Sequence, residues 1–225
     1  MLLFGHSRRA RGRAWGRKGL VGPLGCMAAG FVLVGGHSSR MGRDKAFLRW
    51  HSRFMVEHVA DQVASCVGKL ALIGDPDRYG ALGIDCFPDL HPGVGPLAGI
   101  EAALETKRGE LNLIVACDMP DLETASLLKL LERAEMNDAQ CLAARDENGL
   151  IHPLCAVYRS SCLPVIRGAL EAGRLKLLDV LEELGAVTME IGQRISNVNT
   201  PEEWSVWQQQ ARTTSARQIK SGDGN

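Results

Sequence analysis

The apolar residues of this chain form short continuous runs that alternate with stretches of helical spacing. The first run, Ala-Ala-Gly-Phe-Val-Leu-Val over residues 28–34, stops at two glycines and predicts a buried strand. Residues 54–67 repeat an apolar group every fourth position, which predicts a helix with one apolar face made of Met55, Val59, Val63 and Val67. Residues 69–74 form a second apolar run and predict the next buried strand.

The same alternation continues to residue 134. We expect a short strand or turn near 47–50, helices over 95–106 and 122–134, and a strand over 111–117. The apolar stripe of the helix over 122–134 is expected to hold Leu127, Leu128, Leu131 and Ala134. Strands that alternate with helices pair in parallel through right-handed crossovers. The expected fold class is therefore a three-layer α/β/α, Rossmann-like fold with a mostly parallel central sheet, whose ligands bind beyond the carboxyl ends of the strands.

The second half of the chain is less regular. It predicts strands over 141–144, 154–158 and 187–191, and helices over 160–172 and 176–184. Thr200 and Glu203 have the spacing of a capping box, and Pro201 suits the first helical position, so a helix should run from 202 to about 212. Trp50, Trp204 and Trp207 are interpreted as packing residues.

Length and charge limit the organisation of the chain. Its 225 residues, 45% of them hydrophobic, suffice for one domain, expected over 27–212. Residues 1–26 carry six basic and no acidic side chains, so they are expected to be a disordered extension, or absent if translation starts at Met27. Residues 213–225 are expected to be a disordered tail. Residues 27–225 then carry a net charge of −6, which disfavours nucleic acid as a partner.

The lengths of the apolar runs and the spacing of the cysteines indicate the cellular compartment of the protein. No apolar stretch approaches the roughly 20 residues that cross a bilayer, so we expect no membrane association. The seven cysteines are scattered and include no Cys-x-x-Cys pair. Reduced thiols in a cytoplasmic protein are the simplest interpretation.

The loop after the first strand carries the most informative motif, Gly-Gly-His-Ser-Ser-Arg-Met-Gly-Arg-Asp-Lys over residues 35–45. Gly35 and Gly36 let backbone amides approach a ligand closely, and Arg40 and Lys45 add positive charge. Donors and cations in one loop suit a triphosphate. The loop matches neither the P-loop nor the dinucleotide fingerprint. A surface turn with two incidental cations is the alternative.

Residues 33–45 resemble the signature loop of sugar-nucleotide and cofactor nucleotidyltransferases, and residues 40–45 are especially similar to the molybdenum cofactor guanylyltransferases. The similarity continues in the same order through Gly95-Pro-Leu-Ala-Gly-Ile100, Ala116-Cys-Asp-Met-Pro120, His152-Pro-Leu154, Cys155-Ala-Val-Tyr158 and Asn197-Val-Asn-Thr-Pro-Glu-Glu203. This resemblance spans about 27–212. It implies transfer of GMP from GTP to the terminal phosphate of molybdopterin or Mo-molybdopterin.

Asp118 follows directly on an apolar run, where a carboxylate at the edge of a parallel sheet can hold Mg²⁺. A helix N-cap is the alternative role, but Asp121 is better placed for it. The resemblance implies that Asp118 is the metal ligand and that Lys45 and Arg40 act on the phosphates during catalysis.

The resemblance also implies a set of binding residues. The nucleotide is expected to contact Leu33, Val34, Gly35, Gly36, Lys45, Asp89, Gly95, Gly99 and Asp118. The pterin acceptor is expected to contact His152, Asn197 and Asn199, although turn and cap roles would also explain these residues. Gly74 stands where the family often has asparagine, so a side-chain contact to the nucleotide is in doubt there.

Two other functions fit the same motifs. One is a related nucleotidyltransferase that uses CTP or a sugar-phosphate acceptor, and the other is a non-catalytic module that carries the cofactor. For the cofactor guanylyltransferase, transient contacts with molybdoenzymes or their chaperones are expected.

Overall fold

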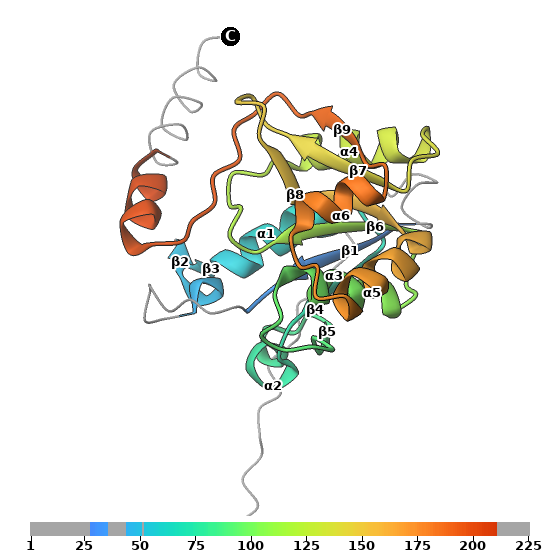
Figure 1. The fold of residues 1–225 in the computed structure, drawn as a ribbon. Helices are drawn as coiled ribbons and strands as arrows, with labels where there is room; N and C mark the ends of the chain where they lie inside the picture. Colours follow the sequence, from blue (N-terminus) through green and yellow to red (C-terminus); the bar gives the residue numbers. More distant parts are fainter. Residues whose placement is uncertain (1–27, 36–43, 51, 211–225) are drawn as a thin grey trace, which may run out of the picture.

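A computed structural model describes residues 28–35, 44–50 and 52–210. The described residues form a seven-stranded sheet in the order β5-β4-β1-β6-β8-β7-β9, shown in Figure 1. Its strands are β1 (Ala28–Leu33), β4 (Lys69–Ile73), β5 (Cys86–Phe87), β6 (Leu111–Ala116), β7 (Cys141–Arg145), β8 (Ile151–Arg159) and β9 (Val187–Glu190). A separate two-stranded ribbon pairs β2 (Arg49–Trp50) with β3 (Arg53–Phe54).

The large sheet is mostly parallel. β1 lies between β4 and β6 and runs parallel to both, with Leu33 opposite Ile73 on one side and Ala116 on the other. β5 is parallel to β4, and β9 is parallel to β7. Among the described strands of this sheet, only β8 is antiparallel to its neighbours, because the short turn 146–150 joins it to β7 as a hairpin. The expected fold class is confirmed, with this one reversed strand as an addition.

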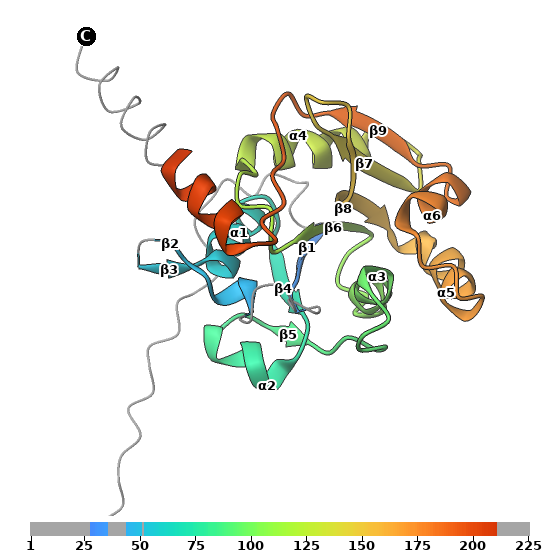
Figure 2. The ribbon, with the colours of Figure 1, turned by 60° about the vertical axis from the view of Figure 1, so that its left-hand side comes forward.

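Helices cover both faces of the sheet, which gives three layers (Figure 2). α1 (Met55–Ala64) and α4 (Thr124–Glu135) pack on the face that Val32 points toward. α3 (Pro96–Glu105), α5 (Leu163–Glu171) and α6 (Leu177–Glu183) pack on the face of the neighbouring Phe31. Side chains of a strand alternate between its two faces, so the uninterrupted apolar run of β1 supplies both cores.

Several short elements have no clear sequence pattern. The 3-10 turn η2 (Lys45–Phe47) precedes β2, and α2 (Pro76–Tyr79) with the turn η3 (Gly80–Leu82) connects β4 to β5. Another 3-10 turn, η4 (Ser160–Cys162), leads into α5. These elements are three or four residues long, too short for hydrophobic periodicity to reveal them.

Two expectations about α4 are wrong. Leu128 is 37% exposed, whereas Leu130 is fully buried, so Leu130 takes the place of Leu128 in the apolar stripe. The N-cap of α4 is Glu123 and not Asp121. The Asp121 carboxylate instead accepts a hydrogen bond from the indole of Trp207, which ties the loop after β6 to the C-terminal helix.

The C-terminal helix covers residues 201–210 of the described part. The expected capping box is present, because the Glu203 amide donates to the Thr200 hydroxyl and the Thr200 amide donates to the Glu203 carboxylate. Trp204 and Trp207 stack with centroids 5.0 Å apart and are buried with Met55, which confirms their packing role. No helix in the described ranges combines the length and apolar character that a bilayer requires.

Candidate active site

The carboxyl ends of β1, β4 and β6 open into a cleft of about 800 Å³. Because β1 and β6 run in register, the residues two positions beyond them, Gly35 and Asp118, reach the same edge of the sheet. Both line the cleft although 83 residues separate them in the sequence. The expected nucleotide-binding residues that line it are Leu33, Val34, Gly35, Lys45, Asp89, Gly95, Gly99 and Asp118. Gly36 and Arg40 lie outside the described residues.

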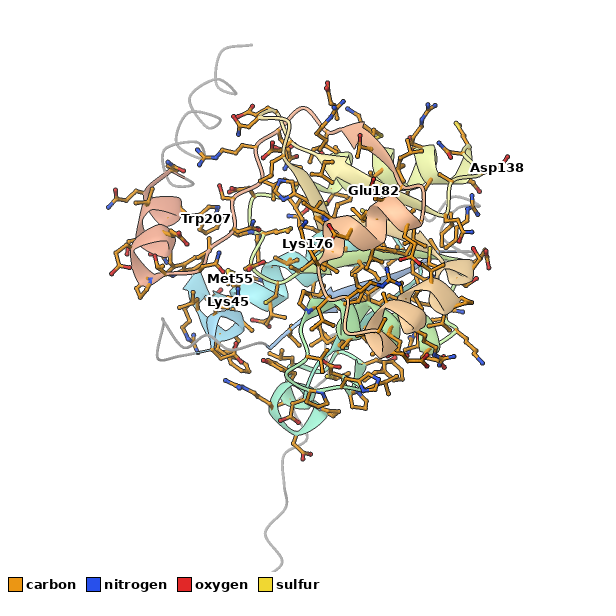
Figure 3. The ribbon with its side chains drawn as sticks, in the orientation of Figure 1. Lys45, Met55, Asp138, Lys176, Glu182 and Trp207 are labelled. Atoms are coloured by element: carbon orange, nitrogen blue, oxygen red, sulfur yellow. The ribbon has the colours of Figure 1, made fainter. Side chains whose placement is uncertain are left out.

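Lys45 joins two distant segments of the chain. Its Nζ lies 2.5 Å from Oδ2 of Asp118 and 3.0 Å from Oδ1 of Asn199. The Val198 amide donates to the carbonyl of Asp118 at 2.9 Å, which fixes the C-terminal segment against the loop after β6. The side chains of Lys45 and Asp118 are 17% and 14% exposed, so the ion pair is shielded but open to the cleft. Figure 3 shows Lys45 on the same side of the molecule as Trp207.

The three expected acceptor residues lie in different surroundings. Asn199 contacts Lys45, and Asn197 is an exposed residue two positions earlier. His152 is only 3% exposed, and its Nε2 lies 3.2 Å from the buried carboxylate of Asp146. A contact between His152 and a ligand in the cleft is therefore not supported, and the structure favours its structural role. Leu154, two residues later, lines the cleft beside a register shift between β7 and β8.

Asp146 keeps its charge at neutral pH despite being buried. Burial alone would raise its pKa, but hydrogen bonds from His152 and from the amides of Leu150 and Asn148 outweigh this effect and lower the pKa. The carboxylate thus closes the turn between β7 and β8 and orients the His152 ring. This pair stabilises the hairpin that supports the cleft wall.

Glycines shape the walls of the cleft. Gly35 and Gly95 have φ values of +95° and +123°, which L side chains rarely adopt. Gly95 is also the N-cap of α3, so the first turn of this helix begins at the cleft. A Cβ on Gly99 would lie 3.2 Å from the Leu33 side chain, and one on Gly74 would lie 2.6 Å from Val34. At Gly74 and Gly99 the cleft wall therefore has little room for a side chain.

The cleft contains residues that the sequence analysis did not select. Asp75, Arg78 and Tyr79 follow β4 and line the cleft beside Gly74. Their position directly after a predicted buried strand was the available signal. The Asp89 side chain accepts a hydrogen bond from the His91 amide at 2.9 Å, so it closes its own turn in addition to lining the cleft.

Asp118 fits a metal ion that arrives with a nucleotide. No cluster of three or more histidine, cysteine, aspartate or glutamate side chains exists in the described ranges, so these residues alone form no complete cage. Mg²⁺ is commonly held by one or two carboxylates together with phosphate oxygens and water. A single shielded carboxylate that lines the cleft matches that pattern.

Cys117 lies beside the metal candidate as a buried thiol. It lines the cleft and is 2% exposed. Burial, followed by the negative charge of Asp118, raises the pKa of its thiol well above the usual range. The six cysteines in the described ranges are all free thiols, as expected for a reduced protein.

Comparisons with known proteins identify the family of the chain. The family model of the MobA-like NTP transferase domain matches residues 30–187. A relative from Carboxydothermus hydrogenoformans is 34% identical over 182 residues, which are 77% of this chain and 91% of the relative. A relative from Deinococcus radiodurans is 36% identical over 172 residues, which are 76% of this chain and 88% of the relative. Both are named probable molybdenum cofactor guanylyltransferases.

A solved structure shows the same fold. Molybdopterin-guanine dinucleotide biosynthesis protein A from Archaeoglobus fulgidus has 25% sequence identity and a TM-score of 0.69. The match covers 82% of this chain and 99% of that protein. Together with the cleft at the carboxyl ends of β1 and β6, these findings show that the chain belongs to the MobA-like NTP transferase family.

Proposed function

We propose that the chain transfers GMP from GTP to the terminal phosphate of molybdopterin, with or without bound molybdenum, to form molybdopterin guanine dinucleotide. The observation that carries this proposal is the contact between Lys45 and Asp118 in a cleft lined by Gly35, Gly95 and Gly99. These residue types supply a cation, a metal-binding carboxylate and accessible backbone at one place. Family membership and the names of the relatives support the same activity.

The reaction requires little acid–base chemistry from the protein. A terminal phosphate oxygen of molybdopterin forms a bond to the α-phosphorus of GTP, while the bond from that phosphorus to the bridging oxygen breaks. Pyrophosphate leaves with this oxygen. A phosphate monoester is largely ionised near neutral pH, so the nucleophile needs no strong general base. Positioning and charge neutralisation would supply most of the rate acceleration.

Lys45 and Asp118 divide this work. In the structure Lys45 is held by Asp118 and Asn199, and a bound triphosphate offers its ammonium further oxygen acceptors. Asp118 would hold Mg²⁺, which supplies positive charge and polarises the phosphate when bound. Arg40 would add a second cation from the same loop, and Asn199 would contact the acceptor. The cleft walls at Leu33, Gly95 and Gly99 would hold the guanine.

The cellular setting follows from the substrates in this proposal. GTP and the pterin acceptor place the reaction in the cytoplasm, and the product would pass to molybdoenzymes or their chaperones through transient contacts. The net charge of −6 over residues 27–225 supports the absence of a nucleic acid partner.

The direct test is incubation of the purified chain with GTP, Mg²⁺ and molybdopterin, with mass spectrometry for the dinucleotide and an assay for pyrophosphate. We expect product with the wild type and turnover reduced about 10²–10³-fold in Asp118→Asn and Lys45→Ala. Lys176→Ala is the matched control, because Lys176 also pairs with an aspartate, at 2.7 Å, but on the exposed surface of α6. Product from CTP and none from GTP would overturn the base assignment, and near-normal turnover of Asp118→Asn would overturn the assigned role of this residue.

A further inference from the structure

Tyr79 holds the start of the turn that carries Lys45. Its hydroxyl donates to Oδ2 of Asp44 at 2.6 Å, and Nε of Arg78 forms an ion pair with the same oxygen at 2.8 Å. The other oxygen of Asp44 accepts from the Ala46 amide at 3.0 Å and caps η2. The residue directly after Asp44 is Lys45, so these hydrogen bonds fix the backbone from which the lysine extends.

The ring of Tyr79 holds the other end of the same turn. It stacks on Phe47 with the centroids 5.5 Å apart and an interplanar angle of 16°. Phe47 in turn packs edge-on against Phe54 at 5.3 Å. One side chain from α2 therefore contacts both the first flank of η2, at Asp44, and its last residue, at Phe47.

Tyr79 also lies against the two glycines at the ends of β1 and β4. A Cβ on Gly35 would lie 3.7 Å from the Tyr79 hydroxyl, and a Cβ on Gly74 would lie 3.1 Å from its ring. The side chain lines the cleft although the residue is only 1% exposed. Tyr79 thus lies next to Gly35 after β1, Gly74 after β4 and the turn η2 that carries Lys45.

The charge on Asp44 favours its contacts with Tyr79 and Arg78. The Asp44 side chain is 5% exposed, and a buried carboxylate is costly unless donors surround it, as Arg78, Tyr79 and the Ala46 amide do here. Burial, together with the hydrogen bond to Asp44, raises the pKa of Tyr79 well above its usual range. The hydroxyl therefore remains a donor at every pH where the enzyme would work.

We propose that Tyr79 is a positioning residue for nucleotidyl transfer, which acts by holding Asp44 and Phe47 so that Lys45 is fixed against Asp118 and the triphosphate. This inference deepens the proposed function and rests on it. Small displacements of a preorganised group are costly in turnover, because charge stabilisation depends on fixed geometry. A purely structural Tyr79 would instead affect stability and leave turnover of the folded enzyme unchanged.

The chain offers a matched control, because it contains two tyrosines and both are 1% exposed. Tyr158 donates its hydroxyl to the Pro153 carbonyl at 2.9 Å, and neither residue lines the cleft. Tyr79→Phe and Tyr158→Phe each remove one buried hydroxyl and keep the ring, so their losses of stability should be similar. We expect kcat to fall about 10-fold in Tyr79→Phe with a smaller change in KM for GTP, and to stay within about 2-fold of wild type in Tyr158→Phe.

Amide hydrogen exchange of residues 44–48 measures the order of this segment without an assay of enzyme activity. We expect this segment to exchange faster in Tyr79→Phe than in Tyr158→Phe. Equal exchange and equal kcat in the two variants would overturn the positioning role. Faster exchange in Tyr79→Phe alongside a wild type that makes no dinucleotide would overturn the proposed function, while still showing that Tyr79 orders residues 44–48. Should Tyr79→Phe fail to fold, Asp44→Asn replaces it, with the same expected fall in kcat, and full kcat in Asp44→Asn would overturn the proposal.

Discussion

Replacing Gly74 with alanine tests whether the cleft wall has room for a side chain. The added Cβ would lie 2.6 Å from Cγ2 of Val34 and 2.9 Å from its carbonyl oxygen. Neither neighbour can yield easily, since the Val34 amide is bonded to the Ile73 carbonyl and the Gly74 amide to the Phe87 carbonyl. Val34 is also β-branched, which limits its rotamers. The substitution must therefore move backbone at the ends of β1 and β4.

The size of the effect follows from the cost of overpacking, about 1–3 kcal/mol. Expressed as stability, this cost lowers the melting temperature of a chain of this size by about 2–12 °C. A cost of this size borne by the GTP-bound state weakens GTP binding by about 5-fold to about 140-fold, since each 1.4 kcal/mol is a factor of about ten. We expect both changes, because Val34 belongs to the core and also lines the cleft.

Gly80→Ala provides the control for this experiment. Gly80 has a φ of −59°, and a Cβ added there would have no neighbouring atom within 4 Å, so alanine should be neutral or slightly stabilising. Thermal melts and isothermal titration of GTP with Mg²⁺ measure both quantities on each variant. If Gly74→Ala has the same melting temperature and the same affinity for GTP as Gly80→Ala, the claim that the cleft wall has no room for a side chain at position 74 is refuted.

Three further predictions concern other parts of the molecule. Asp146→Asn should cost about 1–2 kcal/mol at neutral pH. Because the pKa of Asp146 is lowered on folding, this cost should begin to shrink only below the ordinary carboxyl pKa of about 4 and should be lost as the pH falls through the lowered pKa; a cost independent of pH in chemical denaturation would contradict this. Cys117 should resist alkylation by iodoacetamide at about pH 8 in the folded protein and should react after denaturation. Peptide mass spectrometry measures the extent of labelling, and rapid labelling of the native protein would contradict the burial of this thiol. Thr200→Ala should destabilise the C-terminal helix by about 1 kcal/mol through loss of its cap, and unchanged exchange of residues 201–210 would argue against the capping box.

The long elements could be predicted from the sequence because each carries a strong periodic or continuous apolar signal. β1, β4 and β6 are largely apolar runs, and such runs belong to strands that are buried on both faces. The helix predicted over 54–67 ends earlier, because α1 covers Met55–Ala64. Its predicted apolar residues Met55, Val59 and Val63 are buried, and Val67 is buried just beyond the end of the helix. The direction of β8 was not accessible from periodicity, because a hairpin turn and a crossover can follow similar strands.

The site was only partly predictable. Motif order selected Gly35, Lys45 and Asp118, and parallel pairing of β1 with β6 explains why such distant residues share one cleft. The contact between Lys45 and Asn199 depends on how the last helix packs, which no local pattern specifies. Tyr79 belongs to a four-residue helix without a motif. Only its contacts with Asp44 and Phe47 show that it supports the turn that carries Lys45.

The central claim is that one GTP tail lies between the glycine loop after β1 and the carboxylate of Asp118. The most direct test is a crystal structure of the chain with Mg²⁺ and a GTP analogue that resists transfer. The account predicts phosphate oxygens in contact with Lys45, the metal on Asp118 and the base against Leu33 and Gly99. A nucleotide bound elsewhere, or a metal held away from Asp118, would contradict it.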